Sequence, residues 1–215
     1  SNLVTINATA FEGCTGLTSV QIDGGEKKQT TIADGAFATC ENLSQIITVK
    51  NIKSVGKSVF AKLPVSIVEI SNVDTIGESA FADCDKLYGL TVQNVKTIGS
   101  LAFAGSGEQT DGNIILLDSI QNVGSRVFEG CQFTSADIRN LNTVTTYTDP
   151  ETKIVFSPFA KSNIKEVRFS DEAKHTVCAN AFKNATSLQR VVLSYGTGLD
   201  DISTVDTSAF EGCVN

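Results

Sequence analysis

Cysteine is the residue type in this sequence whose spacing first suggests chemistry. Five of the six cysteines stand three residues after a phenylalanine, as in the segment TIGESAFADCDKL at residues 75–87. These five are Cys14, Cys40, Cys84, Cys131 and Cys213. A thiol can act as a nucleophile, bind zinc or form a disulfide, and each role needs its own partner geometry. The spacing therefore raises the question of whether these cysteines react or pack.

Residues for catalysis or metal binding are sparse. His175 is the single histidine and precedes Cys178 by three residues, a separation that does not define a catalytic dyad. The acidic pairs Asp83 with Asp85 and Asp200 with Asp201 do not follow a calcium-loop pattern, and no phosphate-binding glycine motif is present. The sequence predicts no catalytic residue, no cofactor and no metal site, so we expect that the protein is not an enzyme.

Composition excludes two classes of partner. The chain has 215 residues, of which 41% are hydrophobic, enough for a sizeable core. Its formal charge of -7 argues against nucleic acid, because phosphate binding needs clustered Lys and Arg. No apolar run approaches the roughly 20 residues that span a bilayer, so no transmembrane segment is predicted in this chain.

A repeat organises the whole sequence. Nine segments align on a phenylalanine, namely Phe11, Phe37, Phe60, Phe81, Phe103, Phe128, Phe159, Phe182 and Phe210. The basic period is near 22 residues, with insertions before Phe37, Phe128, Phe159 and Phe210. Five residues before each phenylalanine stands Ile or Val. One such unit cannot bury its own apolar side, so the copies must stack as a solenoid.

The pattern within each copy predicts its local structure. Alternating apolar residues, such as Val68 and Ile70, are typical of a strand with one buried face. The spacing of Ala80, Phe81 and Cys84 indicates about one turn of helix. A glycine column (Gly56, Gly77, Gly99, Gly124) fits a bend that needs positive φ or close backbone approach, and an asparagine column (Asn51, Asn72, Asn94, Asn140) fits a turn. We therefore expect one α/β solenoid domain over residues 1–215, with about eight to nine repeats.

The repeat resembles a known family. The pattern from Leu87 to Val92, together with [VI]-G-x-x-A-F-x-x-C-x-x-L from Ile76 to Leu87, is similar to the BspA-like leucine-rich repeats. This resemblance implies a parallel sheet on one face and short helical turns or irregular segments on the other. It also implies an extracellular or cell-surface protein, with some relatives acting as adhesins. The chain departs from the pattern where asparagines and cysteines of the columns are replaced.

The repeat answers the question about cysteine. Leu63, Ser106, Ser162 and Ala185 replace it in the other copies, which favours packing over chemistry. Only Cys14 and Cys40 lie in adjacent copies, and a bridge between them is disfavoured by disulfide geometry. Cys178 stands outside the column, in the glycine place, and we expect it to be the most exposed thiol. The chain begins and ends partway through a copy, so we expect further repeats or contacts that cover its ends.

The strand residues between the buried positions predict a partner surface. Counting back from each phenylalanine gives two outward columns, from which the candidate binding residues are Ile46, Thr48, Ile67, Glu69, Thr91, Ile114, Leu116, Arg168 and Arg190. Apolar members of an outward column mark interaction surface or burial under another segment. The charged residues at the C-terminal end form either an internally paired ladder, which neighbouring opposite charges favour, or part of a recognition site.

The longest insertion adds a further candidate. Residues 143–156, TVTTYTDPETKIVF, alternate around Tyr147, reach a turn at Asp149 and Pro150, and return through Ile154 and Phe156. This pattern predicts a hairpin that projects beside the charged end of the sheet. Tyr147 is added to the candidate binding residues, although a merely tolerated insertion is the alternative.

These features favour a non-catalytic binding module. The sheet face would bind a protein, and the family resemblance points to a host matrix or cell-surface protein as ligand. A structural spacer that displays another domain is one alternative. A glycan-binding protein is another, but it would need aromatic platforms, for which only Tyr88, Tyr147 and Tyr195 are available. The oligomeric state stays open.

Overall fold

The computed structural model describes residues 4–107, 112–141, 144–169, 175–193 and 202–214. Side chains 115–119, 139–141, 175–176, 193 and 202–203 lie outside this description. The strands are β1 (Thr5–Ile6), β2 (Val20–Asp23), β3 (Thr31–Ile32), β4 (Ile46–Val55), β5 (Ile67–Ile76), β6 (Gly89–Ile98), β7 (Asn113–Ile120), β8 (Asn122–Val123), β9 (Ser135–Leu141), β10 (Tyr147–Thr148), β11 (Val155–Phe156), β12 (Glu166–Phe169), β13 (His175–Val177), β14 (Arg190–Leu193) and β15 (Ile202–Val205).

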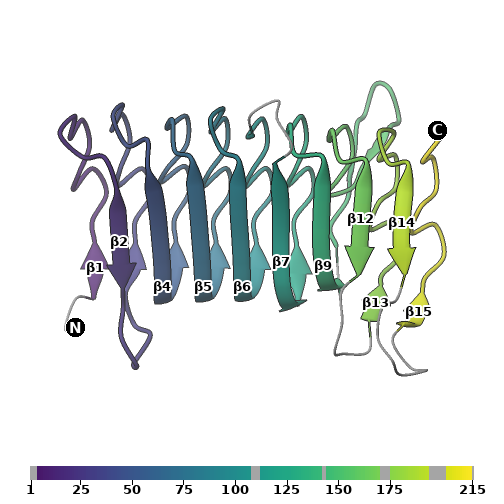
Figure 1. Cartoon of the computed structure of the whole chain (residues 1–215), viewed down its shortest axis with the longest axis horizontal. Helices are drawn as coiled ribbons and strands as arrows, with labels where there is room; N and C mark the ends of the chain where they lie inside the picture. The colour runs from purple at the N-terminus through teal and green to yellow at the C-terminus, as the bar shows by residue number, and fades with distance from the viewer. Residues whose placement is uncertain (1–3, 108–111, 142–143, 170–174, 194–201, 215) are drawn as a thin grey trace.

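The strands stack in two parallel rows along a solenoid (Figure 1). The front sheet consists of β2, the first halves of β4, β5 and β6, then β7, β9, β12 and β14. The second row consists of β1, β3, the last residues of β4, β5 and β6, and then β8, β13 and β15. Alternate residues of the front sheet, such as Val68 and Ile70, are buried between this sheet and the rest of each coil. The predicted parallel-sheet solenoid is confirmed.

The corner between the two rows is made by the asparagine column. Asn51, Asn72 and Asn94 have φ values of 54°, 54° and 49°, in the left-handed region that asparagine tolerates. Their side chains form a ladder, in which Asn94 Nδ2 donates to Asn72 Oδ1 at 3.2 Å and Asn72 Nδ2 donates to Asn51 Oδ1 at 2.7 Å. Each asparagine therefore turns its own strand and also hydrogen-bonds the asparagine of a neighbouring copy.

The segments around the phenylalanines are tandem turns, and the described residues contain no helix. The residue two after the phenylalanine has positive φ in all nine copies, for example Asp83 at 58°, and Ser79 on the other side has 54°. Left-handed residues this close together are incompatible with a right-handed helix. Alternate amides instead bond the next copy, as when the Phe81 N–H donates to the Ala102 carbonyl at 2.8 Å. The predicted helical turn is therefore wrong. The sequence pattern was misleading because tandem turns direct Ala80, Phe81 and Cys84 inward, as a helical turn would.

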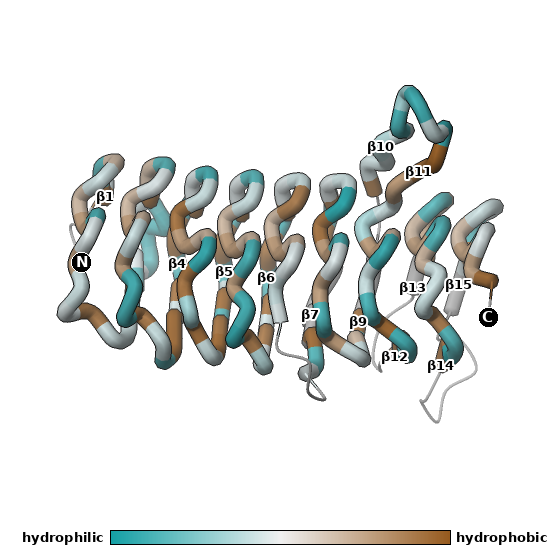
Figure 2. Tube along the Cα trace, turned by 90° about the horizontal axis from the view of Figure 1, so that it is seen from above, coloured by the Kyte–Doolittle hydropathy of each residue, from teal (hydrophilic) through white to brown (hydrophobic). Residues whose placement is uncertain are grey.

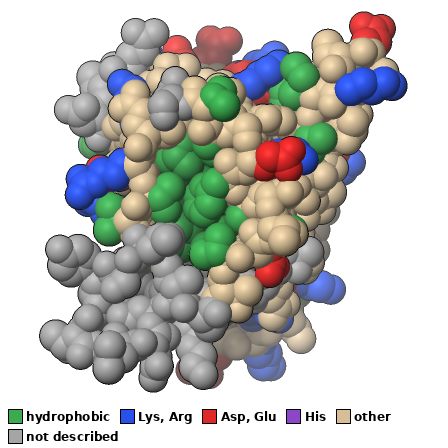
Figure 3. Space-filling model, turned by 90° about the vertical axis from the view of Figure 1, so that its right-hand side faces the viewer, with side chains coloured by type: hydrophobic (Ala, Val, Ile, Leu, Met, Phe, Trp, Pro, Cys, Tyr) green, Lys and Arg blue, Asp and Glu red, His purple; other side chains and the backbone are tan. Residues whose placement is uncertain are grey.

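The nine phenylalanine rings form one continuous stack. Every successive pair is stacked, with ring centroids between 4.6 Å (Phe159–Phe182) and 5.7 Å (Phe103–Phe128). Phe81 is fully buried, whereas Phe11 at one end is 38% exposed. At the other end, hydrophobic side chains gather on the face beside β14 and β15 (Figure 3). The stack is the element of the core that runs through every copy.

The glycine column marks the tightest approach between copies. A Cβ on Gly77 would lie 2.6 Å from the Gly56 carbonyl carbon, and one on Gly124 would lie 2.4 Å from the Ser100 nitrogen. Real Cβ atoms do not approach backbone this closely, so a side chain would force the copies apart. Neither glycine has a positive φ. Close backbone approach, and not positive φ, therefore explains why glycine recurs at this position.

Candidate functional site

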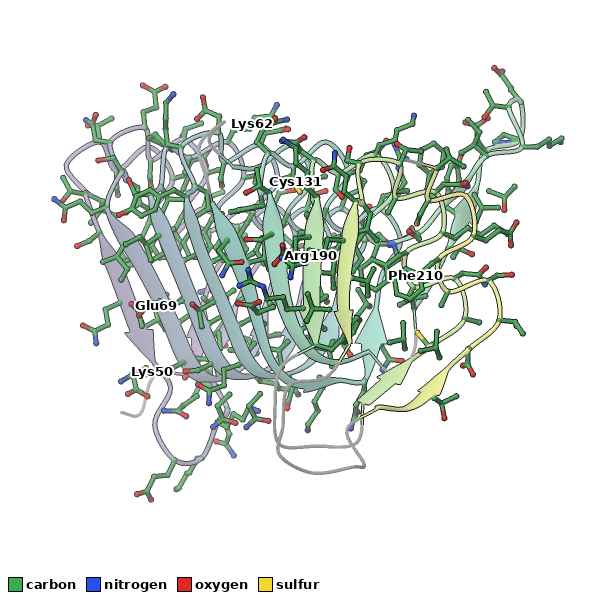
Figure 4. The ribbon with its side chains drawn as sticks, turned by 45° about the vertical axis from the view of Figure 1, so that its right-hand side comes forward. Lys50, Lys62, Glu69, Cys131, Arg190 and Phe210 are labelled. Atoms are coloured by element: carbon green, nitrogen blue, oxygen red, sulfur yellow. The ribbon has the colours of Figure 1, made fainter. Side chains whose placement is uncertain are left out.

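The outer face of the front sheet carries most of the predicted binding residues. The register aligns Ile46, Ile67, Gly89, Asn113, Ser135, Glu166 and Arg190 in one outward column. Thr48, Glu69, Thr91, Asp137, Arg168 and Val192 belong to the next. Glu69 and Arg190 stand on this outer face in Figure 4. These predicted residues therefore do lie on one surface.

Two predicted members of the columns were placed wrongly. Ile114 is fully buried and pairs with Leu90, an inward residue, while Leu116 pairs with Val92 at another inward register position. The side chain of Leu116 is outside the described part of the structure. The cause is a register shift in β7 between Leu116 and Ser119, where β7 has one more residue than β9. The sequence prediction counted back from Phe128 at a constant spacing. The extra residue therefore put Ile114 and Leu116 on the wrong face of the strand.

Over strands β4, β5 and β6, the apolar part of the face is small. Ile46 and Ile67 are half-buried neighbours, and Gly89 follows them in the column. A Cβ on Gly89 would lie 3.7 Å from Ile67 Cγ1, in ordinary contact, so glycine leaves one edge of Ile67 open. Over β4, β5 and β6, the predicted apolar stripe thus reduces to a spot of two isoleucines, which is no more than many protein surfaces expose.

A shallow polar hollow of about 270 Å³ lies beside this spot. It is lined by Thr48, Lys50, Glu69, Ile70, Ser71, Thr91 and Gln93. Lys50 lies at its edge (Figure 4). Its ammonium pairs with Asp23 at 3.4 Å. Hydroxyl, amide, ammonium and carboxylate groups converge here. Such a mixed surface can hydrogen-bond polar groups of a partner.

The charged end of the face is internally paired. Glu166 binds Arg190 Nη1 through Oε2 at 3.2 Å and binds Arg168 Nε through Oε1. Further along, Asn113 Nδ2 donates to Asp137 Oδ2 at 3.3 Å. The ladder that the sequence favoured at this end is therefore present, and the two arginines keep part of each guanidinium exposed.

The cysteine column packs and also bonds. Cys84 is fully buried, and its thiol donates to the Phe60 carbonyl of the preceding copy at 3.2 Å. Ser106 replaces cysteine and donates in the same way to the Phe81 carbonyl at 2.6 Å. Burial raises the pKa of Cys84 to about 12, so this thiol stays protonated near neutral pH. The column therefore has a bonding role that sequence reasoning missed.

The expectation for Cys178 was wrong. Cys178 is only 7% exposed, whereas Cys14 and Cys213 in the outer copies are partly exposed. The glycine place that Cys178 occupies faces another backbone and not solvent, which explains its burial. The His175 side chain lies outside the described residues, as do Asp200 and Asp201. Within the described part, no group of three His, Cys, Asp or Glu is placed to hold a metal ion.

The hairpin of β10 and β11 is fixed to the solenoid by an arginine. The strands pair antiparallel, with Tyr147 opposite Phe156. The Arg126 guanidinium lies 5.4 Å from the Tyr147 ring centroid and 5.2 Å from that of Phe156, and its Nε binds Glu129. This bond to Glu129 is the main reason that the pKa of Arg126 is raised. Cation–π contacts of this kind contribute about 0.5 to 2 kcal/mol each.

The hairpin and the sheet face are separate surfaces. Figure 2 shows β10 and β11 on the side of the solenoid away from β12 and β14. Tyr147 therefore does not share a surface with Arg168. The hairpin lies at the predicted place along the solenoid axis, but on a different side of the solenoid from the charged end of the sheet. Sequence reasoning missed Arg126 altogether. The sequence feature that could have indicated this contact is the pair of aromatic residues, Tyr147 and Phe156, on one short hairpin, because their rings need another side chain to pack against.

The geometry defines a class of protein, a parallel β-solenoid with leucine-rich-repeat columns. The model of the BspA-type leucine-rich repeat region, in six copies, matches residues 4–135 and 94–215. The chain therefore belongs to the BspA-type leucine-rich repeat family. This repeat commonly mediates protein–protein interaction, and the fold is generally a non-enzymatic binding scaffold.

No curated protein matches the chain at a significant level. A solved leucine-rich repeat protein from Bacteroides ovatus is similar at 22% identity, over 98% of this chain and 68% of that one, with a TM-score of 0.36. Among the described residues, no helix is long and apolar enough to cross a membrane.

Proposed function

We propose that this protein is a surface or secreted binding module that recognises a protein partner through the outer face of its front sheet. The observation that carries the proposal is this uncovered face, where no described segment lies over the outward columns (Figures 1 and 2). Glu69 and Arg168 are exposed there, although the stacking of copies requires neither side chain. A host matrix or cell-surface protein is the partner class that we propose.

The size of the face sets what the partner must contact. Eight strands about 4.8 Å apart span about 34 Å, and four or five residues along each strand add about 15 Å. The resulting flat area of about 500 Å² is below the roughly 800 Å² that each partner of a stable complex usually buries. A partner must therefore also contact the rims, which include the charged end around Arg190.

Two other functions receive less support. A glycan-binding face would need stacked aromatic platforms, but Tyr88 is an isolated exposed aromatic side chain at 48%, and Tyr147 is engaged by Arg126. Tyr195 is outside the described residues. For a structural spacer the face supplies no positive observation, because exposed polar columns keep a spacer soluble just as they do a binding module. A binding experiment must therefore separate the two.

The test uses arrays of purified extracellular-matrix proteins and polysaccharides, probed with the intact chain. We expect binding to one or more proteins, lost at least ten-fold in Glu69→Lys, which reverses a charge in the middle of the face. Glu12→Lys makes the same change at an exposed turn away from the sheet and should bind as the unmodified chain does. Protein binding that Glu69→Lys leaves intact would place the site elsewhere, and no binding at all would support the spacer.

A further inference from the structure

A second hollow lies between the hairpin and the turns of the following copies. It is lined by Ile154, Phe156, Ala160, Lys161, Asn184 and Thr186, and its volume is about 270 Å³. Phe156 and Ala160 are buried and form its apolar floor, while Ile154 is 40% exposed at its wall. We call these six residues the hairpin hollow. Cavities for drug-sized ligands measure about 300 to 1,000 Å³, so the hairpin hollow fits one or two protein side chains better.

The wall of the hairpin hollow is held in place before any ligand binds. Arg126 is in contact with both hairpin aromatic rings, and Asn184 Nδ2 donates to the Val155 carbonyl at 2.9 Å from the next copy. At the tip, Asp149 Oδ1 accepts the Thr152 N–H at 2.7 Å, which closes the turn. A hairpin fixed at its base and at its tip loses little conformational entropy on binding, which favours affinity.

The rim of the hairpin hollow carries a positive charge. Lys161 Nζ lies 4.4 Å from the Phe156 ring centroid, and this side chain is 56% exposed. Glu129 Oε1 lies 4.0 Å from Lys161 Nζ, at the outer limit of an ion pair, and Glu129 is already bound by Arg126. Glu211, two copies further on, pairs with Lys183 at 3.0 Å. Asp149 is engaged within the hairpin tip, and its pKa is lowered mainly by its hydrogen bonds to Thr152 and in smaller part by the charge of Lys161. Lys161 is thus a weakly neutralised cation beside an apolar cavity.

We propose that the hairpin hollow is a second binding site, which takes an extended protein segment with a large apolar side chain next to an Asp or Glu. The apolar side chain enters the hollow against Phe156 and Ala160, and the carboxylate meets Lys161 at the rim. A buried apolar anchor is the usual centre of an interface hot spot, and a charged contact at the rim adds specificity. The net charge of -7 does not oppose this, because charges beyond about 8 Å are screened at physiological salt.

The experiment is a selection of displayed random twelve-residue peptides on the folded chain. We expect enriched peptides in which Leu, Ile, Phe or Trp stands within two positions of Asp or Glu. Lys161→Glu should weaken them at least ten-fold, and Ile154→Ser should weaken them five-fold or more. Raising the salt concentration should weaken binding to the unmodified chain.

Lys153→Glu is the matched control. It reverses the same charge on the neighbouring hairpin, at a similar positive φ (61° against 56° for Lys161), but the Lys153 ammonium donates to the Pro150 carbonyl outside the hollow. It should leave peptide affinity within two-fold. Circular dichroism and denaturation of each variant establish that the solenoid remains folded.

Three results would overturn the proposal. The first is a selection without any enriched motif, and the second is enriched peptides that bind Lys161→Glu as tightly as the unmodified chain. The third is sedimentation showing a dimer that Ile154→Ser dissociates, which would make a second copy of the chain the occupant. The Glu69→Lys variant should bind the selected peptides normally, so failure of this site and failure of the sheet-face site can be told apart.

Discussion

The regular copies at residues 46–103 and the C-terminal copies at residues 135–214 use the same columns but build different strands. In the regular copies, β4, β5 and β6 have ten residues each, and one strand supplies both rows through an asparagine corner. In the C-terminal copies, β12 and β13 are separate strands of four and three residues. The phenylalanine stack nevertheless continues, with Phe159 and Phe182 at 4.6 Å. The comparison teaches that the ring stack and its turns propagate the solenoid, while the corner tolerates insertions.

This division also separates the two proposed surfaces. The polar hollow lies over the regular strands β4, β5 and β6, where neighbouring copies repeat the same geometry. The hairpin hollow arises where an insertion leaves the second row and returns at Phe156. Repetition therefore gives a broad shallow face, and interruption of the repeat gives a concave site with chemically distinct walls.

The largest expected effect compares the stack in the two regions. Phe81→Ala and Phe159→Ala each remove a fully buried ring with stacked neighbours on both sides, so each should lower the free energy of unfolding by about 3 to 5 kcal/mol. Urea denaturation followed by circular dichroism measures both. A loss at Phe159 of less than half that at Phe81 would mean that the C-terminal copies do not depend on the stack.

A smaller loss of stability is expected at the asparagine corner, which is complete only in the regular copies. Asn72→Ala removes the side chain that bonds Asn51, Asn94 and Lys28, and it leaves Ala at a φ of 54°. The loss should be about 1 to 3 kcal/mol. Asn72→Gly loses the same bonds but fits the backbone, so it should be less destabilising in the same urea experiment. Equal losses for the two variants would show that backbone strain plays no part.

The mildest test leaves the sequence unchanged and follows thiol labelling in the native state by peptide mass spectrometry. Cys14 and Cys213 should react first with iodoacetamide, while Cys84, with a pKa of about 12, and Cys178, whose pKa burial also raises, should react slowly. Fast labelling of Cys178 alone would show that the C-terminal copies open independently of the regular ones.

The same pKa shift gives a pH dependence with a definite sign. The thiol of Cys84 titrates near 9.0 when unfolded and near 12 when folded. Between these values the folded state holds a proton that the unfolded state has lost, so stability falls as pH rises from about 9 to about 12. Below pH 9 this contribution is fully present. A Cys84→Ser variant, which resembles Ser106 in the same column, should reduce this slope.

The columns could be predicted from the sequence because each copy repeats them, but departures from the period could not be placed. The single extra residue in β7 shifts Ile114 to the inward face, and nothing in the sequence NIILLDSI identifies where the shift occurs. Apolar residues occupy both faces of this strand, so alternation gives no register. The helical-turn prediction failed for a related reason: Ala80, Phe81 and Cys84 face inward in tandem turns as they would in a helix.

The hairpin illustrates a second limit. Its alternating pattern predicted two strands and a turn, and β10 and β11 are observed, but the direction in which it leaves the solenoid depends on tertiary contacts. The aromatic rings of Tyr147 and Phe156 bind Arg126, a residue from the preceding copy. A long-range pair of this kind has no spacing in the sequence by which it can be recognised. The site residues Lys161 and Asn184 come together only through the stacking of copies.

The direction of the backbone hydrogen bonds has a mechanical consequence. All strands lie across the long axis of the solenoid, so tension along that axis loads the bonds of one strand at a time and peels the copies apart in sequence. A copy such as that from Phe81 to Phe103, with 22 residues, would release about 70 Å of chain, whereas the copy from Phe128 to Phe159, with 31 residues, would release about 100 Å. The stacked coils would therefore extend in steps under load, and the longest step would come from the copy that carries the hairpin.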